Sequence, residues 1–156
     1  MEILTETNIF TSFKLLQFIE LTEPKYYLEI ESNPNNLITV EEFVNYFSVE
    51  LGLNEEKING LLLAITEATT NAIIHGNKNN QLKMVRIYVF VEDSTLTIKI
   101  KDEGKGFDPS IVPDPTDPEN LLKDSGRGLY LMRVYMDGLT YNQTSEGTEA
   151  ILTVKI

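Results

Sequence analysis

Two glycine-rich stretches and one polar pair carry the residue types that could do chemistry in this chain. The first stretch, residues 102–107, reads D-E-G-K-G-F and follows an apolar run typical of a strand. Gly104 and Gly106 would let the main chain approach a flat or charged ligand closely, since neither has a Cβ. Asp102, at the strand end, is placed to accept a hydrogen bond from an exocyclic amine. The alternative is a simple turn after a strand.

The second stretch, residues 125–129, reads S-G-R-G-L and opens a helical pattern. Main-chain amides at a helix N-terminus, with Gly126 and Gly128 for close approach, form an anion site suited to phosphates. A plain loop-to-helix junction is the alternative. Neither stretch is a Walker loop, because no G-K-[ST] occurs, and neither is a G-x-G-x-x-G after a first strand.

The polar pair is Glu67 and Asn71, four residues apart within a helical pattern. That spacing places one side chain above the other on a single helix face. The alternative is that both are solvated residues of an amphipathic helix. The apolar positions of the same segment recur at three- and four-residue steps and predict one buried stripe: Ile58, Leu61, Leu62, Ile65, Ala68, Ala72 and Ile73.

Charge and composition narrow the classes of partner. The 156 residues include 24 acidic and 13 basic ones, a formal net charge of −11, and no cysteine. Such a chain is a poor candidate for nucleic acid or anionic membranes, and a basic or neutral protein partner fits better. Disulfides and thiolate metal sites are excluded. With no secretory signal at the start and no apolar run of ~18 residues, we expect a cytoplasmic protein.

The elements that must position these residues follow one another as strand, helix, helix, strand, strand, cover, helix, strand, strand. Strands are predicted at 26–30, 84–91, 96–102, 138–143 and 149–156, and helices at 37–51, 54–75 and 126–136. Strands joined by tight turns are antiparallel, so the order predicts an α+β two-layer sandwich, a mainly antiparallel mixed sheet with helices on one face. Residues 107–125 hold four prolines and read as a functional cover. Residues 1–24 are interpreted as an N-terminal extension and 25–156 as the domain.

In order and spacing, the stretches E-x-x-x-N-x-x-x-H-G, D-x-G-x-G-F and G-R-G-L resemble the three nucleotide-binding boxes of the GHKL (histidine-kinase-like) ATP-binding superfamily. Within this superfamily, the amino-acid sequences of these stretches are most similar to those of the anti-sigma-factor serine/threonine kinases. The resemblance covers about residues 26–156 and implies the histidine-kinase-like ATPase fold.

The resemblance implies roles for individual residues, with ATP and Mg²⁺ as cofactors. Asn71 stands where the family has its magnesium ligand and Glu67 where it has its general base. Asp102 would accept from the adenine amino group. Adenine and phosphate contacts are expected from the remaining motif residues: Gly104, Gly106, Phe107, Ser125, Gly126, Arg127, Gly128 and Leu129.

Four positions leave alternatives open. Lys123 and Arg127 are both candidates for a γ-phosphate contact. Asp124 stands where some family members have an arginine, which puts that contact in doubt. His75, the only histidine, fits a helix-end or cover-supporting role better than a metal ligand.

The resemblance leaves more than one activity open. Sensor histidine kinases need a hairpin bearing a phosphoacceptor histidine, and gyrase, chaperone and mismatch-repair relatives need a transducer domain, so neither class is expected. We expect a protein serine/threonine kinase that phosphorylates a small antagonist protein and acts as an anti-sigma factor or similar partner-switching regulator. The alternatives are a nucleotide-dependent binding module that sequesters a partner, and a slow ATPase that acts as a timer. A homodimer is possible.

Overall fold

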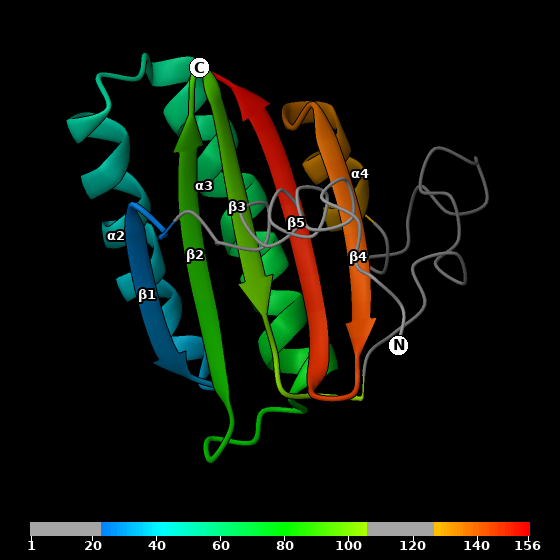
Figure 1. The fold of residues 1–156 in the computed structure, drawn as a ribbon. Helices are drawn as coiled ribbons and strands as arrows, with labels where there is room; N and C mark the ends of the chain where they lie inside the picture. The colour runs from blue at the N-terminus through cyan, green and yellow to red at the C-terminus, as the bar shows by residue number, and fades with distance from the viewer. Residues whose placement is uncertain (1–22, 106–126) are drawn as a thin grey trace, which may run out of the picture.

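The computed structural model describes residues 23–105 and 127–156, and these form one α+β unit. The expected two-layer architecture is confirmed, with a sheet on one side and helices on the other (Figure 1). The elements, in chain order, are β1 (Tyr26–Glu31), the 3₁₀ turn η1 (Pro34–Asn36), α2 (Leu37–Glu50), α3 (Glu55–Asn71), the π-helical turn η2 (Ala72–Gly76), β2 (Met84–Glu92), β3 (Thr95–Lys101), α4 (Arg127–Tyr135), β4 (Gly138–Thr144) and β5 (Gly147–Lys155).

The five described strands lie in the order β1-β2-β3-β5-β4. Every pairing among them is antiparallel, so this part of the chain contains no parallel pair. Asp93 turns the β2–β3 hairpin with a left-handed φ of 50°, a conformation that aspartate tolerates better than most residues. Because β5 lies between β3 and β4, the last hairpin places its second strand beside β3, the strand that Asp102 directly follows.

Alternating side chains of the sheet form the floor of the core. On β2, for example, Val85, Ile87 and Val89 are fully buried, while the residues between them are only partly buried. The three helices of the described residues lie on this face, and α3 packs between α2 and α4 (Figure 1). The largest fully buried side chains come from both layers: Phe47, Leu61, Ile65, Ile73, Ile87, Leu96, Ile98, Ile100, Met132 and Leu152.

Helix α3 runs the length of the domain and has a well-defined start. The Asn54 side chain accepts a hydrogen bond from the Lys57 amide at 2.9 Å, as expected for an N-cap. Glu55 and Glu56 follow in the first turn, where carboxylates complement the helix dipole. Gly60 allows α4 to approach, because a Cβ there would lie 3.0 Å from the Tyr135 ring.

The end of α3 differs from a regular helix. Residues 72–76 form a π-helical turn, in which the Asn77 amide donates to the Ala72 carbonyl at 2.8 Å. The sequence predicts a helix to about residue 75 but not this widened turn. Single π turns often lie at functional sites, and this one directly follows Asn71.

Within residues 23–105 and 127–156, no helix is long and apolar enough to cross a membrane.

Candidate functional site

Close contacts at glycines bring the three sequence motifs together. A Cβ on Gly76, at the end of the first motif, would overlap the Asp102 carboxylate of the second. A Cβ on Gly104 would overlap the carbonyl oxygen of Gly76, and one on Gly128 would overlap the Glu67 carboxylate. These glycines therefore allow close contact between η2 and the loop after β3, and between α3 and the start of α4.

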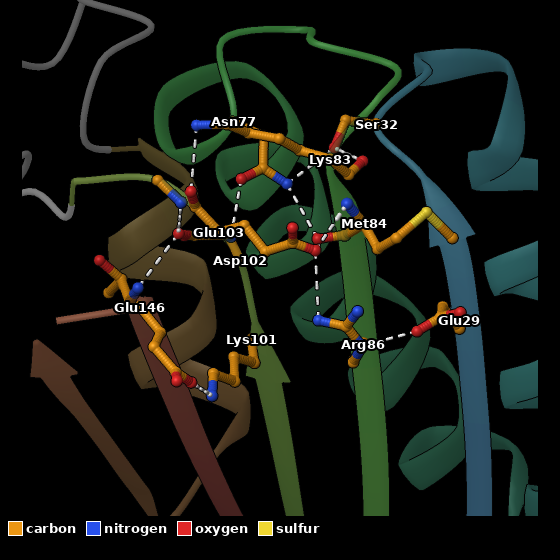
Figure 2. Close-up of polar contacts among 12 residues, drawn as sticks. Glu29, Ser32, Asn77, Lys83, Met84, Arg86, Lys101, Asp102, Glu103 and Glu146 are labelled. Atoms are coloured by element: carbon orange, nitrogen blue, oxygen red, sulfur yellow. Dashed lines mark hydrogen bonds and ion pairs between the residues drawn. The ribbon is translucent and has the colours of Figure 1, made fainter. Parts of the chain in front are cut away.

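Asp102 is held as an oriented acceptor. Its side chain is almost fully buried, and its Oδ1 accepts hydrogen bonds from the Gly104 amide at 2.8 Å and the Thr148 amide at 3.1 Å (Figure 2). The bond to Gly104 closes a turn of the type that aspartate favours. Oδ2 lies against Gly76 and accepts no hydrogen bond from a described residue. The carboxylate therefore keeps one oxygen for a donor from outside the described structure.

Strand β5 supports this carboxylate from the other side. The Asp102 amide donates to the Thr148 carbonyl at 2.9 Å, which completes a two-way link with the Thr148 amide. Gly147, with a φ of +146°, lies so close to Asp102 that a Cβ would overlap its carbonyl oxygen. Gly147 and Thr148 were not predicted as site residues, because a glycine in a hairpin turn and a main-chain contact of a threonine do not indicate which distant segment they approach.

Glu67 is a half-buried carboxylate on α3. Burial raises its pKa above the ordinary value, and the nearby positive charge of His75 opposes that shift. Within the part of the chain that the structure describes, the Glu67 side chain forms no hydrogen bond or ion pair. A carboxylate with a raised pKa and no competing donor is suited to accept a proton.

Tyr141 of β4 is a neighbour of Glu67 that the sequence analysis missed. Burial raises the pKa of Tyr141 to about 12, while the charge of Arg133 lowers it and that of Glu67 raises it. The Tyr141 hydroxyl therefore lies within electrostatic reach of both Glu67 and Arg133. The strand period places Tyr141 on the inner face of the sheet, which was the only available signal.

Asn71 is the last residue of α3 and is also half-buried. It follows Glu67 by one helical turn, and side chains at this spacing are neighbours. Its carboxamide forms no hydrogen bond with another described residue. Among residues 23–105 and 127–156, no three histidine, aspartate or glutamate side chains gather as a metal-binding group. A single amide oxygen fits Mg²⁺, which takes one or two protein ligands beside water and phosphate oxygens.

The other predicted site residues divide into two groups. Arg127 begins α4 and is exposed, whereas the Leu129 side chain is 6% exposed and belongs to the core. His75 is exposed at the end of η2. Outside the described residues lie Gly106, Phe107, Lys123, Ser125 and Gly126, most of the N-terminal extension, and the proline-rich cover.

An antiparallel sheet with helices on one face, and an oriented carboxylate facing a glycine-lined helix end, define the class of histidine-kinase-like nucleotide-binding domains. Residues 30–154 match the family of histidine kinase-like ATPase domains, and the chain belongs to this family. Membership in a family of ATPase domains implies ATP binding. The predicted resemblance to the GHKL superfamily is thereby confirmed.

Relatives with the name anti-sigma F factor align over most of the chain. The protein of Clostridium botulinum is 32% identical over 126 residues, which cover 80% of this chain and 88% of the relative. The protein of Clostridium acetobutylicum is 33% identical over 137 residues, which cover 85% of this chain and 92% of the relative. The protein of Anoxybacillus flavithermus is 34% identical over 116 residues, which cover 71% of this chain and 75% of the relative.

Solved structures support the fold. The RsbU and RsbW domains of Rv1364c from Mycobacterium tuberculosis match with a TM-score of 0.62 at 16% identity, over 83% of this chain and 31% of that one. The histidine kinase domain of a blue-light activated kinase from Erythrobacter litoralis matches with a TM-score of 0.52 at 17% identity, over 81% and 61%. At these identities the likeness concerns the fold alone.

Proposed function

We propose that this protein is an ATP-dependent serine/threonine protein kinase that acts as an anti-sigma factor or similar partner-switching regulator. Its substrate would be a small antagonist protein, and its second partner a sigma factor. The similarity to anti-sigma F factors over 80% of the chain supports this class of regulator. The cysteine-free composition fits a cytoplasmic protein.

The observation that carries the kinase proposal is the state of Glu67. A binding module needs no base, yet this half-buried carboxylate has a raised pKa and no hydrogen bond to a described residue. It lies against Gly128 at the start of the helix whose amides would meet the phosphates. Glu67 would take the proton of a serine or threonine hydroxyl as that oxygen bonds to the γ-phosphorus. The bond between that phosphorus and the β–γ bridging oxygen breaks, and ADP leaves.

Asn71 would hold Mg²⁺ through its side-chain oxygen. When bound, the ion neutralises phosphate charge and orients the triphosphate. The half-buried carboxamide one turn from Glu67 forms no hydrogen bond with another described residue, which supports this assignment because its oxygen is available to a cation.

Asp102 would accept from the adenine amino group through Oδ2, since Oδ1 is already used by two main-chain amides. Gly104 lies beside it and would line the adenine pocket. Main-chain amides of 126–128 would contact phosphates, with Arg127 as a candidate for the γ-phosphate. Gly106, Phe107, Ser125 and Leu129 complete the proposed nucleotide contacts.

The proposal is tested by incubating the purified protein with γ-labelled ATP, Mg²⁺ and candidate antagonist proteins. We expect label on a serine or threonine of one antagonist, and none when Mg²⁺ is removed. Label that appears only as free phosphate would identify an ATPase timer instead. Stable nucleotide-dependent capture of a partner without any label would identify a binding module.

A further inference from the structure

Asn77 is a buried carboxamide just beyond the predicted nucleotide motifs. Its residue is 1% exposed, and all three of its side-chain hydrogen bonds go to other segments. Its Oδ1 accepts from the Glu103 amide at 2.7 Å, and its Nδ2 donates to Ser32 Oγ at 2.7 Å and to the Met84 carbonyl at 3.0 Å (Figure 2). One side chain thus joins η2 to the ends of three strands.

The residue type matches this task. One atom must accept from a main-chain amide while its neighbour donates twice, and only a carboxamide offers both at fixed geometry. Ser32 is itself fully buried, and its Oγ, which accepts from Asn77, donates in turn to the Lys83 carbonyl at 2.8 Å. The bonds of Asn77 and Ser32 therefore fix the start of β2 and the end of β1 against η2.

Glu103 is the residue that this network immobilises most strongly. Besides the bond from its amide to Asn77, its carboxylate accepts from the Met84 amide at 3.0 Å and from Arg86 at 3.2 Å. Its carbonyl accepts from Lys83 Nζ at 3.1 Å. Glu103 lies between Asp102 and Gly104, so these bonds hold the main chain on which the Asp102 carboxylate is mounted.

We propose that Asn77 is a positioning residue for base recognition: it sets the Asp102 carboxylate in register with an adenine amino group. The inference rests on the proposed adenine contact of Asp102. Gly76 precedes Asn77 and is packed against both the Asp102 carboxylate and Gly104. Asn77 is therefore joined to Gly76 by the chain and to Glu103 by a hydrogen bond. Together these links hold the Asp102 carboxylate between η2 and the loop after β3.

The position of the Asp102 carboxylate determines the selectivity for ATP over GTP, because the strength of a hydrogen bond depends steeply on its geometry. Adenine presents a donor to Oδ2, whereas guanine presents a carbonyl acceptor at the same place on its ring. A displaced Asp102 loses the bond to adenine but gains none to guanine. Loss of Asn77 therefore weakens ATP binding far more than GTP binding.

The test measures ATP and GTP affinity by calorimetry on the full chain with Mg²⁺. Asn77→Ala is expected to lower ATP affinity on the order of tenfold, the effect of one lost hydrogen bond to a charged group, and to leave GTP affinity nearly unchanged. Ser32→Ala removes one partner of Asn77 and keeps the bond to Glu103. Ser32→Ala is expected to lower the ratio of ATP affinity to GTP affinity as Asn77→Ala does, but by a smaller factor. If Asn77→Ala does not fold, the result for Ser32→Ala decides whether the positioning role holds.

Two matched controls separate positioning from general loss of stability. Ser48→Ala makes the same change as Ser32→Ala at another fully buried serine, on α2, whose hydroxyl has no hydrogen-bond partner among the described residues. Val44→Ala destabilises the core from α2 without touching the loop. Both are expected to keep the wild-type ATP/GTP ratio, even where the melting temperature falls as far as in Asn77→Ala.

Asp102→Asn separates the proposed adenine contact of Asp102 from the positioning role of Asn77. If it narrows the ATP/GTP ratio while Asn77→Ala and Ser32→Ala leave the ratio unchanged, the adenine contact stands and the positioning role is overturned. If Asp102→Asn itself leaves the ratio unchanged, the adenine contact fails and the inference falls with it. In the double variant, Asn77→Ala is expected to narrow the ratio no further, because its effect passes through Asp102. A further narrowing would overturn the inference.

Discussion

Glu67 holds a negative charge where burial opposes it. Its folded pKa is raised above the ordinary 4.5, mainly by burial, although His75 offsets part of the shift. The folded state therefore binds the proton more tightly than the unfolded chain does. By linkage, the stability of the fold decreases as pH rises from about 4.5 through the raised pKa and loses nothing more above it. This loss of stability is the consequence of burying the carboxylate that we propose as the base.

Glu67→Gln removes that loss of stability without changing the shape of the side chain. We expect a higher melting temperature than wild type at pH 8, where the wild-type carboxylate is charged, and little difference at pH 4. Phosphoryl transfer should be lost in the same variant, since an amide accepts no proton. Melting curves at both pH values check the first statement. An equal shift at pH 4 and pH 8 would show that the carboxylate charge is not the cause.

Asp102→Asn tests the adenine contact at a single atom. The Gly104 and Thr148 amides both require an acceptor at the Oδ1 position, so the new side chain keeps its oxygen there and turns its NH₂ toward Gly76. A donor then faces the donor of adenine. We expect ATP affinity to fall on the order of tenfold or more while the fold survives. Unchanged ATP affinity, with unaltered melting, would remove Asp102 from base recognition.

At the scale of elements, Gly128 couples the positions of α3 and α4. A Cβ there would overlap the Glu67 carboxylate, which is the mobile end of a side chain, so the helices can stay in place if Glu67 moves. We expect Gly128→Ala to fold and bind ATP but to transfer phosphate ~10²-fold more slowly, in line with the effect of a misplaced catalytic group. Gly138→Ala is the matched control, because its Cβ would meet only the Thr153 side chain in the sheet. Equal rates in the two variants would contradict this coupling.

Helices and strands were largely predictable because their patterns are local. The alternation in β2 and the helical stripe of α3 gave elements whose ends differ by only a few residues from those observed. The π-helical turn was not predictable, since residues 72–76 keep the apolar spacing of an ordinary helix. The turn ends at Asn77, whose side chain forms hydrogen bonds with segments far away in the sequence, and such contacts cannot be predicted from a local pattern.

The site was predictable only where a motif required a particular residue type. Spacing singled out Glu67, Asn71 and Asp102, but not the packing of Glu67 against Gly128. Tyr141 and Thr148 come from the last hairpin, whose place beside β3 depends on strand order rather than on local sequence. Long-range pairing of this kind is decided by the whole fold.

At the scale of the whole molecule, the site is built from both halves of the chain. Residues 55–101 supply α3 and β3, and the last hairpin supplies Thr148 and Tyr141, so we expect nucleotide binding to stabilise contacts between distant segments. A net charge of −11 favours a basic or neutral protein partner and speeds encounter with a basic one at low salt. We therefore expect partner binding and phosphoryl transfer to be separable properties, the first dependent on the charged surface and the second on the proposed site.

That separation gives the last prediction, which distinguishes a kinase from a binding module. Glu67→Ala keeps Asn71, so ATP should still bind, while transfer falls by ~10²–10⁴ through loss of the base. A kinase with this change should hold its partner and fail to switch, since the antagonist stays unphosphorylated. Asn71→Ala should instead lose Mg²⁺-dependent ATP binding and transfer together. Partner retention by pull-down and label transfer, measured on both variants, check these outcomes. Wild-type transfer by Glu67→Ala would refute the assignment of the base, and normal switching without transfer would favour the binding module.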